Sequence, residues 1–188
     1  MTTTAANHTA TPLFSTDYHI YINHTDAGGI VYHANHLVFF ENCRRDWFTK
    51  LNLNGYFMHS DEGQVQHFVV SQAQLQYKKA ILLDEVINVR IDRVELKPAS
   101  IVFYQSIHRR LPADADEKQR SSTNTLLSSS KIVIACVQNQ IKPEPPQSTN
   151  ASSTTTAVDN ATPMRPIRVP EKLYNTIQQA IAHHADEQ

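Results

Sequence analysis

Hydrophobic and polar residues alternate in five stretches of this chain, as they do in half-buried β-strands. The first stretch is 17–23, in which Tyr18, Ile20 and Ile22 fall on one face. Because the gaps between the other four stretches are short, we expect those strands to be antiparallel neighbours in one sheet. These four stretches are 67–80, 84–97, 100–110 and 129–138.

A different spacing predicts one long helix between the first and second strands. Over residues 34–53, apolar residues recur every three or four positions, which is the pattern of an amphipathic helix. About five turns, at roughly 3.6 residues each, would span a small sheet, and Gly55 is the expected stop. A shorter helix is predicted over 169–184, with Pro170 near its start. The inward face of the long helix is predicted to carry Leu37, Phe40, Cys43, Trp47 and Leu51.

This order of elements is typical of an α+β domain in which an antiparallel sheet wraps around a helix. An edge strand of such a sheet would stay exposed, so we expect pairing with a second copy of the chain. The chain has 188 residues, which suits one domain at 15–188 behind a disordered Thr- and Ala-rich tail at 1–14. Two polar inserts, 112–125 and 142–163, are predicted to be mobile surface loops without catalytic residues.

Composition excludes several classes of function. The formal net charge is -1, so no field of the whole chain attracts nucleic acid or an anionic membrane. No apolar run reaches roughly 18 residues, so no integral membrane segment is expected. The N-terminus lacks the basic and apolar regions of a signal peptide, and a cytoplasmic location is expected. Cys43 and Cys136 are predicted to be reduced core thiols.

Residues 23–36, "NHTDAGGIVYHANH", concentrate chemically active side chains between the first strand and the long helix. Three of the ten histidines lie there, with Asp26 and the Gly28-Gly29 pair. A carboxylate can attack a carbonyl carbon or activate water. The free N–H groups at the helix start, close to His33, can stabilise an oxyanion, and an imidazole can move a proton. These are the parts of an acyl-transfer site.

Plainer interpretations of the same residues stay open. Asp26 would also suit a turn in which it hydrogen-bonds its own backbone, and the glycines would then only form that turn. His24, His33 and His36 are nominal metal ligands, but no cysteine pair and no HExxH motif accompanies them. The basic pairs Lys78-Lys79 and Arg109-Arg110 are either solvated strand ends or contacts for a phosphate-bearing ligand.

The stretch "HTDAGGIVYHANHLVFFENCRRDWF" resembles the signature of the hotdog-fold acyl-CoA thioesterases. Within them it is most similar to the 4-hydroxybenzoyl-CoA thioesterase family and its YbgC-type branch, which is associated with the Tol–Pal system. The likeness extends to residues 69–107, which look like the second to fourth strands of the family and include Tyr77, Ala80 and Asp84, and to "MRPIRVPEKLYNTI" near the C-terminus. It covers residues 16–111, 128–141 and 163–181.

The resemblance implies a hotdog fold, with a five-stranded antiparallel sheet around a central helix, and hydrolysis of an acyl-CoA. It places the catalytic carboxylate on Asp26. It places the N–H that polarises the thioester carbonyl on His33, whose side chain would assist. The acyl-CoA would be bound by Gly28, Gly29, Tyr32, Lys78 and Lys79. It also implies paired protomers, usually a homotetramer, with sites between subunits, no metal or other cofactor, and acyl carrier protein as a possible partner.

This chain departs from the branch pattern at two places before Asp26, and these departures leave other functions open. The branch often has a tyrosine four residues before the aspartate, followed by an acidic pair, whereas this chain has Ile22 and then Asn23-His24. A non-catalytic module that binds acyl-CoA or acyl carrier protein is therefore the main alternative, and a hotdog dehydratase is a weaker one. The acyl group, and the choice between nucleophile and general base for Asp26, are open at this point.

Overall fold

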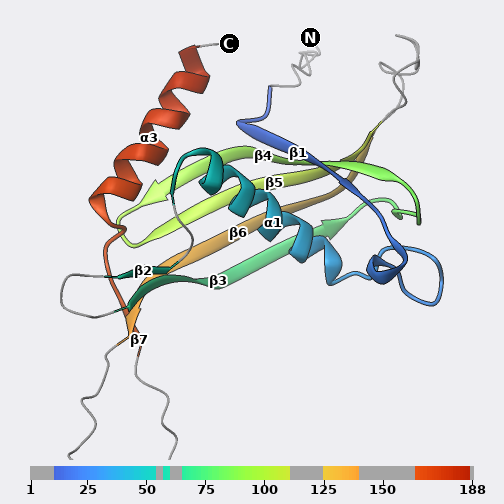
Figure 1. The fold of residues 1–188 in the computed structure, drawn as a ribbon, viewed down its shortest axis with the longest axis horizontal. Helices are drawn as coiled ribbons and strands as arrows, with labels where there is room; N and C mark the ends of the chain where they lie inside the picture. Colours follow the sequence, from blue (N-terminus) through green and yellow to red (C-terminus); the bar gives the residue numbers. More distant parts are fainter. Residues whose placement is uncertain (1–10, 54–56, 60–64, 111–124, 140–163, 187–188) are drawn as a thin grey trace, which may run out of the picture.

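The computed structural model describes residues 11–53, 57–59, 65–110, 125–139 and 164–186. Seven strands form one antiparallel sheet in the order β1-β4-β5-β6-β3-β2, and β7 pairs with β6 (Figure 1). The strands are β1 (Phe14–His19), β2 (Phe57–His59), β3 (Val65–Tyr77), β4 (Val86–Lys97), β5 (Ser100–Arg109), β6 (Leu126–Asn139) and β7 (Met164–Pro166). The helices are the 3-10 turn η1 (Ile22–His24), α1 (Asn35–Lys50) and α3 (Glu171–Asp186).

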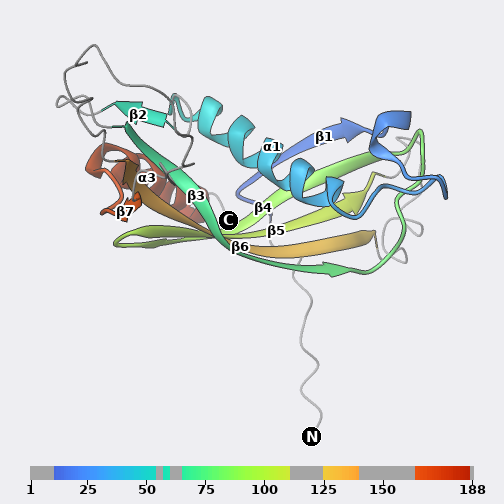
Figure 2. The same cartoon turned by 90° about the horizontal axis from the view of Figure 1, so that it is seen from below.

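The sheet curves beneath α1, which lies across one of its faces, while α3 stands at one end of the sheet near β4 (Figure 2). This arrangement confirms the predicted α+β hotdog fold. The five predicted strands all exist, but the sheet has seven. The two unpredicted strands, β2 and β7, are three residues long each, which is too short for an alternating pattern to be recognised.

The first strand lies earlier than the sequence predicts. It begins at Phe14, paired with Ile91, and ends at His19, so the domain starts within the predicted tail. Ile20 is fully buried, but Ile22 lies in η1 and is 73% exposed. The alternation therefore continues by chance past the point where the chain turns. The rest of the predicted tail, 1–10, lies outside the described residues.

α1 supplies one side of the core. Phe40, Cys43 and Trp47 are buried as predicted, whereas Leu37 is 37% exposed and Leu51 is half-buried. The true inner face is rotated slightly and is completed by His36, Phe39, Arg44 and Phe48. Burial of one large apolar side chain contributes about 1.5–3 kcal/mol, so this face accounts for much of the stability. The opposing sheet residues include Ile87, Ile91, Phe103, Ile132 and Ile134.

A buried arginine interrupts this apolar face. Arg44 is only 2% exposed, its Nη1 donates to Gln105 Oε1 at 2.7 Å, and its guanidinium lies 5.7 Å from the centre of the Phe103 ring. Gln105 in turn donates through Nε2 to the Phe40 carbonyl at 3.0 Å. The pair thus ties the middle of α1 to β5.

α1 ends at Lys50, and two residues later Asn52 has a φ of 54°, the left-handed conformation that commonly terminates helices. The predicted stop, Gly55, lies outside the described residues. α3 starts at Glu171, directly after Pro170, and buries Leu173 and Ile177. No helix of the described chain is long and apolar enough to cross a bilayer.

Hydrogen bonds hold the strand ends on both sides of the two polar inserts. The Arg109 N–H donates to the Thr125 carbonyl at 2.8 Å, and Asn139 at the end of β6 pairs with Met164 of β7. The inserts themselves, apart from Thr125, lie outside the described part, and their predicted mobility stays a prediction. The predicted reduced thiols agree with the structure, because Cys43 and Cys136 are both free and buried. Burial raises the pKa of Cys43 to about 12 and that of Cys136 to about 11.

Candidate active site

A loop between η1 and α1 carries Asp26 to one end of the molecule. Its two arms are joined by a bridge between Thr25 and Val31, and the Asp26 N–H donates to the Ile30 carbonyl at 2.9 Å. The loop is also attached to the connection between β3 and β4. There the Val31 N–H donates to the Ile81 carbonyl at 2.9 Å, and Ile30 bridges to Leu82.

Asp26 is exposed and sits in the tight turn that the sequence predicts. The Gly28 N–H donates to its Oδ1 at 2.8 Å, and the Gly29 N–H donates to its carbonyl at 3.1 Å. Gly29 has a φ of 75°, so glycine is the favoured residue there. The turn interpretation is therefore correct as geometry. In this turn, Oδ2 of Asp26 accepts no hydrogen bond from the residues that the structure describes. This oxygen is therefore open to a ligand or to water.

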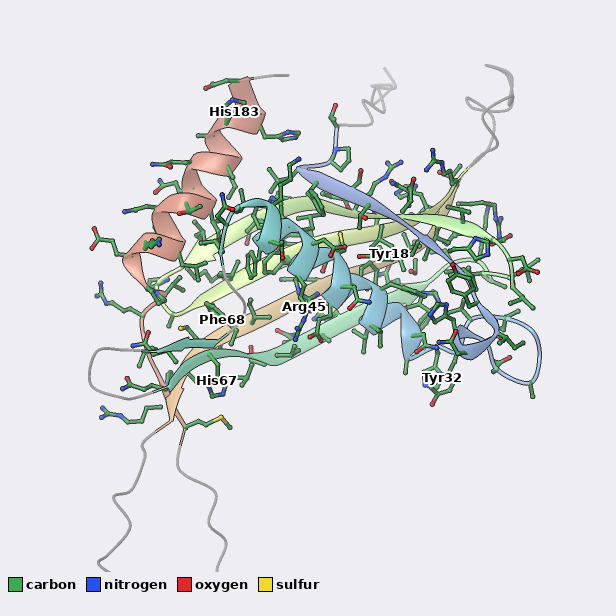
Figure 3. The ribbon with its side chains drawn as sticks, viewed as in Figure 1. Tyr18, Tyr32, Arg45, His67, Phe68 and His183 are labelled. Atoms are coloured by element: carbon green, nitrogen blue, oxygen red, sulfur yellow. The ribbon has the colours of Figure 1, made fainter. Side chains whose placement is uncertain are left out.

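His33 lies where the sequence places it, two residues before α1 begins. Its side chain is exposed and packs against the Tyr32 ring, 4.3 Å between ring centres, and Tyr32 itself is 45% exposed. Figure 3 shows Tyr32 beyond the amino end of α1. Within the described ranges the His33 N–H donates no hydrogen bond. The positive end of the helix dipole adds to its suitability for a developing negative charge.

Neither a hydrogen bond nor an ion pair joins Asp26 to His33 within the described residues. The two residues share one loop and one end of the molecule. The predicted lysines follow the end of β3: the Lys78 and Lys79 N–H groups both donate to the Leu127 carbonyl, at 2.8 and 3.0 Å, and both side chains are exposed. The Lys78 Nζ donates to Gln76 Oε1 at 3.1 Å.

The other two histidines of the segment have structural roles. His24 Nδ1 accepts the Tyr21 N–H at 3.0 Å, which closes η1. His36 is 4% exposed and its Nδ1 is hydrogen-bonded to Ser128 Oγ at 2.9 Å. Burial, with a smaller contribution from His33, lowers the pKa of His36 to about 4, so its imidazole is neutral at pH 7. No group of three or more metal-ligating side chains gathers in the described residues.

Sequence reasoning missed two polar side chains that fix this region. Asn35 Nδ2 donates to the His24 carbonyl at 2.7 Å, and the Tyr77 hydroxyl donates to the His33 carbonyl at 3.1 Å. Tyr77 and Leu75 fall on the same face of β3 in its period-two pattern, but the pattern gives no partner for the Tyr77 hydroxyl. Its contact spans 44 positions of sequence, and a local pattern cannot identify such a partner.

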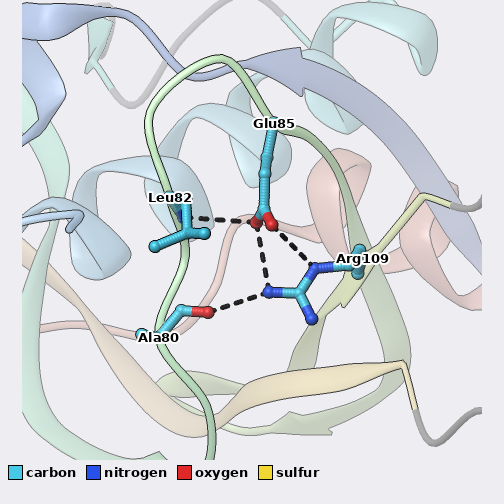
Figure 4. Close-up of polar contacts among 4 residues, drawn as sticks. All are labelled: Ala80, Leu82, Glu85 and Arg109. Carbon is cyan, nitrogen blue, oxygen red and sulfur yellow. Dashed lines mark hydrogen bonds and ion pairs between the residues drawn. The ribbon is translucent and has the colours of Figure 1, made fainter. Parts of the chain in front are cut away.

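The Arg109 side chain binds within the chain, at the β3–β4 connection, and is not free to contact a phosphate-bearing ligand. Its Nε and Nη2 donate to the two oxygens of Glu85 at 2.9 and 3.2 Å, and Nη2 also donates to the Ala80 carbonyl at 3.0 Å (Figure 4). Glu85 Oε2 further accepts the Leu82 N–H at 3.2 Å. The neighbouring Arg110 forms an ion pair with Asp17. Both guanidinium groups are thus used within the chain.

Exposed large apolar side chains are concentrated in and beside the loop: eight of the ten found in the described residues belong to this part of the chain. Exposed apolar patches often mark interaction sites. Two clefts lined by described residues contain neither Asp26 nor His33; the larger of these two, about 730 Å³, lies beside the start of α3. The exposed apolar residues of the loop, the start of α1 and the β3–β4 connection are Tyr21, Ile22, Ile30, Tyr32, Leu37, Val38, Tyr77 and Leu82.

Comparison with known proteins identifies the family of this chain. Residues 28–112 match the thioesterase superfamily. The chain is 35% identical over 132 residues to the acyl-CoA thioesterase YbgC of Haemophilus influenzae, covering 69% of this chain and 85% of that protein. It is 26% identical over 127 residues to the acyl-CoA thioester hydrolase YbgC of Escherichia coli O157:H7, covering 68% and 84%.

Solved structures share the fold at low sequence identity. The 4-hydroxybenzoyl CoA thioesterase from Pseudomonas sp. strain CBS-3 aligns with a TM-score of 0.59 and 14% identity, covering 87% of this chain and 97% of that one. The hypothetical protein TT1821 from Thermus thermophilus aligns with a TM-score of 0.59 and 20% identity, covering 88% and 98%. With its signature segment, its fold and its relatives taken together, the chain belongs to the thioesterase superfamily, in the branch of the YbgC-type acyl-CoA thioesterases.

Proposed function

We propose that this protein is a thioester hydrolase that converts an acyl-CoA to a carboxylic acid and free coenzyme A. The observation that carries the proposal is the loop from Asp26 to His33. It carries an exposed carboxylate with an open Oδ2 and leads into a helix start at which the His33 N–H donates no hydrogen bond to the described residues. Family membership supplies the thioester as the substrate class.

In the proposed reaction the thioester carbonyl oxygen accepts the His33 N–H. Asp26 then either attacks the carbonyl carbon, giving an anhydride that water cleaves, or removes a proton from a water molecule that attacks. In both routes the C–S bond breaks, coenzyme A leaves as a thiolate, and the thiolate takes up a proton. The His33 imidazole is exposed beside this point and is proposed to assist. Tyr32, Gly28, Gly29, Lys78 and Lys79 remain the proposed contacts for the acyl-CoA.

We further propose a homo-oligomer built on β3, as a dimer or as a tetramer of two dimers. β2 pairs with β3 at Val65 to His67, and from Val69 to Tyr77 this edge of β3 has no strand beside it within the described part of the chain. A long open edge favours pairing with the same edge of a second copy. Such pairing would also cover part of the exposed apolar surface and would enclose the acyl group between subunits. A cytoplasmic location and acyl carrier protein as a partner remain predictions.

The experiment is a thiol-release assay with acetyl-, hexanoyl-, palmitoyl- and benzoyl-CoA on the wild type and on Asp26→Asn. We expect Asp26→Asn to lower kcat at least about 10²-fold for the best substrate, because the amide neither attacks nor accepts the proton. The matched control is Asp186→Asn, which removes an exposed carboxylate at the end of α3.

Undiminished turnover by Asp26→Asn would exclude this residue as the catalytic carboxylate. Tight acyl-CoA binding by the wild type without any thiol release would instead favour the binding module. The binding module has a structural basis in the residue four positions before Asp26, where YbgC-type enzymes often have a tyrosine. Ile22 supplies no hydroxyl, and the neighbouring Tyr21 ring packs against His19 and His24, 4.7 and 5.8 Å between ring centres.

A further inference from the structure

The two peptide groups on either side of His33 are both held by their carbonyl oxygens. The Tyr32 carbonyl, in the peptide before His33, accepts the Asn35 N–H at 2.8 Å. The His33 carbonyl, in the peptide after it, accepts the Tyr77 hydroxyl at 3.1 Å. The backbone of His33 is therefore fixed from one side by the first turn of α1 and from the other by the end of β3.

Holding these carbonyls also sets the direction of the N–H groups. In a planar trans peptide the N–H points away from the C=O. The His33 N–H therefore points away from the Asn35 contact, and the Ala34 N–H points away from Tyr77. Neither N–H donates a hydrogen bond to a described residue. Both are thus presented as free donors at the start of α1, where an oxyanion would be stabilised.

The position of Tyr77 follows from the sheet register and from His36. Tyr77 lies opposite Ser128 in the β3–β6 pairing, and Ser128 Oγ is hydrogen-bonded to the buried His36. The Tyr77 ring meets the His36 ring edge-on, at 5.0 Å and 87°. A slip of one residue along β3 would turn Tyr77 to the opposite face of the sheet. The bulge between Val70 and Gln72 contributes to the register that prevents this.

Asn35 links the same turn to the arm that carries the carboxylate. The His24 carbonyl, two residues before Asp26, accepts both Asn35 Nδ2 at 2.7 Å and the Tyr32 N–H at 3.0 Å. A displacement of the backbone around His33 would therefore also reach the arm that leads into Asp26. The oxyanion donors and the carboxylate share one set of supports.

We propose that Tyr77 is a positioning residue for thioester hydrolysis: its hydroxyl holds the His33 carbonyl so that the backbone N–H groups at the start of α1 stay aimed at the thioester oxygen. The inference rests on the proposed hydrolysis and deepens it. Tyr77 acts through the His33 backbone and not by donating to the substrate. Its ring packing against His36 and its hydroxyl contact are separable, because phenylalanine keeps the first and removes the second.

The test compares Tyr77→Phe with wild type by thiol release, using the best substrate among acetyl-, hexanoyl-, palmitoyl- and benzoyl-CoA. We expect kcat to fall about tenfold or more with KM changed less than about threefold, because the hydroxyl acts on the alignment of the oxyanion donors. The matched control is Tyr104→Phe. Tyr104 belongs to the same sheet but follows the inward-facing Phe103 and packs under Arg93 at 3.8 Å, so it should behave as wild type.

An equilibrium measurement separates positioning from a structural role. Carbonyl-¹³C-labelled benzoyl-CoA is bound to Asp26→Asn and to Asp26→Asn/Tyr77→Phe, and its carbonyl stretch is recorded by difference infrared spectroscopy. We expect a smaller shift from the free ligand in the double variant. Equal carbonyl shifts, an unchanged kcat, or a melting temperature that falls in proportion to the lost activity would each overturn the inference. Absence of hydrolysis by the wild type would instead remove the proposed function itself, and this inference with it.

Discussion

Substituting Gly28 tests how closely the turn controls the Asp26 carboxylate. A Cβ added at Gly28 would stand 3.1 Å from Asp26 Oδ1, the oxygen that also accepts the Gly28 N–H at 2.8 Å. At that distance the oxygen must move by a few tenths of an ångström. Gly28 does not have the left-handed φ of its neighbour, so alanine there causes crowding without backbone strain.

The size of the effect follows from the hydrogen bond that is disturbed. A hydrogen bond to a charged group contributes about 1.5–3 kcal/mol, and exposure of Asp26 reduces this to about 1–2 kcal/mol. If between half and all of that value is lost from carboxylate alignment, kcat of Gly28→Ala should fall about two- to thirtyfold. The free energy of unfolding should change by less than about 1 kcal/mol, because the turn is exposed.

Gly29→Ala is the matched control, one residue away, with the opposite expectation. Its Cβ would meet nothing within 4 Å, but its φ of +75° is strained for alanine. The strain costs about 1–2 kcal/mol, which lowers the melting temperature of a domain of this size by about 2–8 °C. The kcat of folded Gly29→Ala should stay close to that of the wild type, since the added Cβ does not crowd the Asp26 carboxylate.

The assay is thiol release under saturating acyl-CoA together with thermal unfolding of both variants. The reasoning predicts a loss of kcat in Gly28→Ala and a loss of stability in Gly29→Ala. A wild-type kcat in Gly28→Ala would refute the idea that the position of Oδ1 matters for turnover. A loss of stability in Gly28→Ala together with a loss of kcat in Gly29→Ala would refute the geometry of the turn itself.

Two further predictions concern the supports of the site. Burial lowers the pKa of His36 from 6.5 to about 4, so its stabilising effect is complete above pH 6.5 and is lost as the pH falls toward 4. Between pH 7 and pH 4 the free energy of unfolding by urea should therefore fall less in His36→Gln than in the wild type, by up to about 3 kcal/mol. An equal fall in the two proteins would contradict the burial of a neutral imidazole. Arg109→Met should cost on the order of 1 kcal/mol in unfolding free energy and lower kcat several-fold, because the Glu85 pair holds the connection that pairs with Val31. Loss of stability with full kcat in that variant would show that the connection does not influence the active-site loop.

The parts of the fold that sequence predicts are those in which burial repeats with a fixed period. The alternation of Ile87, Val89 and Ile91 identified β4, since one face of that strand is fully buried. The same rule failed at Ile22, where hydrogen bonds close a 3-10 turn although the alternation of residue types continues. The helical pattern also predicts a buried Leu37, which is 37% exposed, because an exposed leucine and a buried one look alike in the sequence.

The chemistry of the candidate site was predictable where it depended on neighbours in sequence. Asp26 and Gly29 form a turn whose hydrogen bonds span two or three residues. The contact of Tyr77 with His33 and the burial of Arg44 depend on which strands pair and on where β3 bulges. Those choices follow from the folding of the whole sheet and leave no local signal in the residue types.

The hydrogen bonds at the ends of the two inserts affect how freely this chain can change length. Each insert leaves and re-enters the sheet at positions already held together, Arg109 with Thr125 and Asn139 with Met164. For such closed loops the entropic cost grows only with the logarithm of length, by about 0.6 kcal/mol for each doubling. Since both inserts are predicted to be mobile loops, we expect insertions and deletions there to be nearly neutral for stability. Genetic drift in these two segments can alter their size and composition without disturbing the turn of Asp26 or the start of α1.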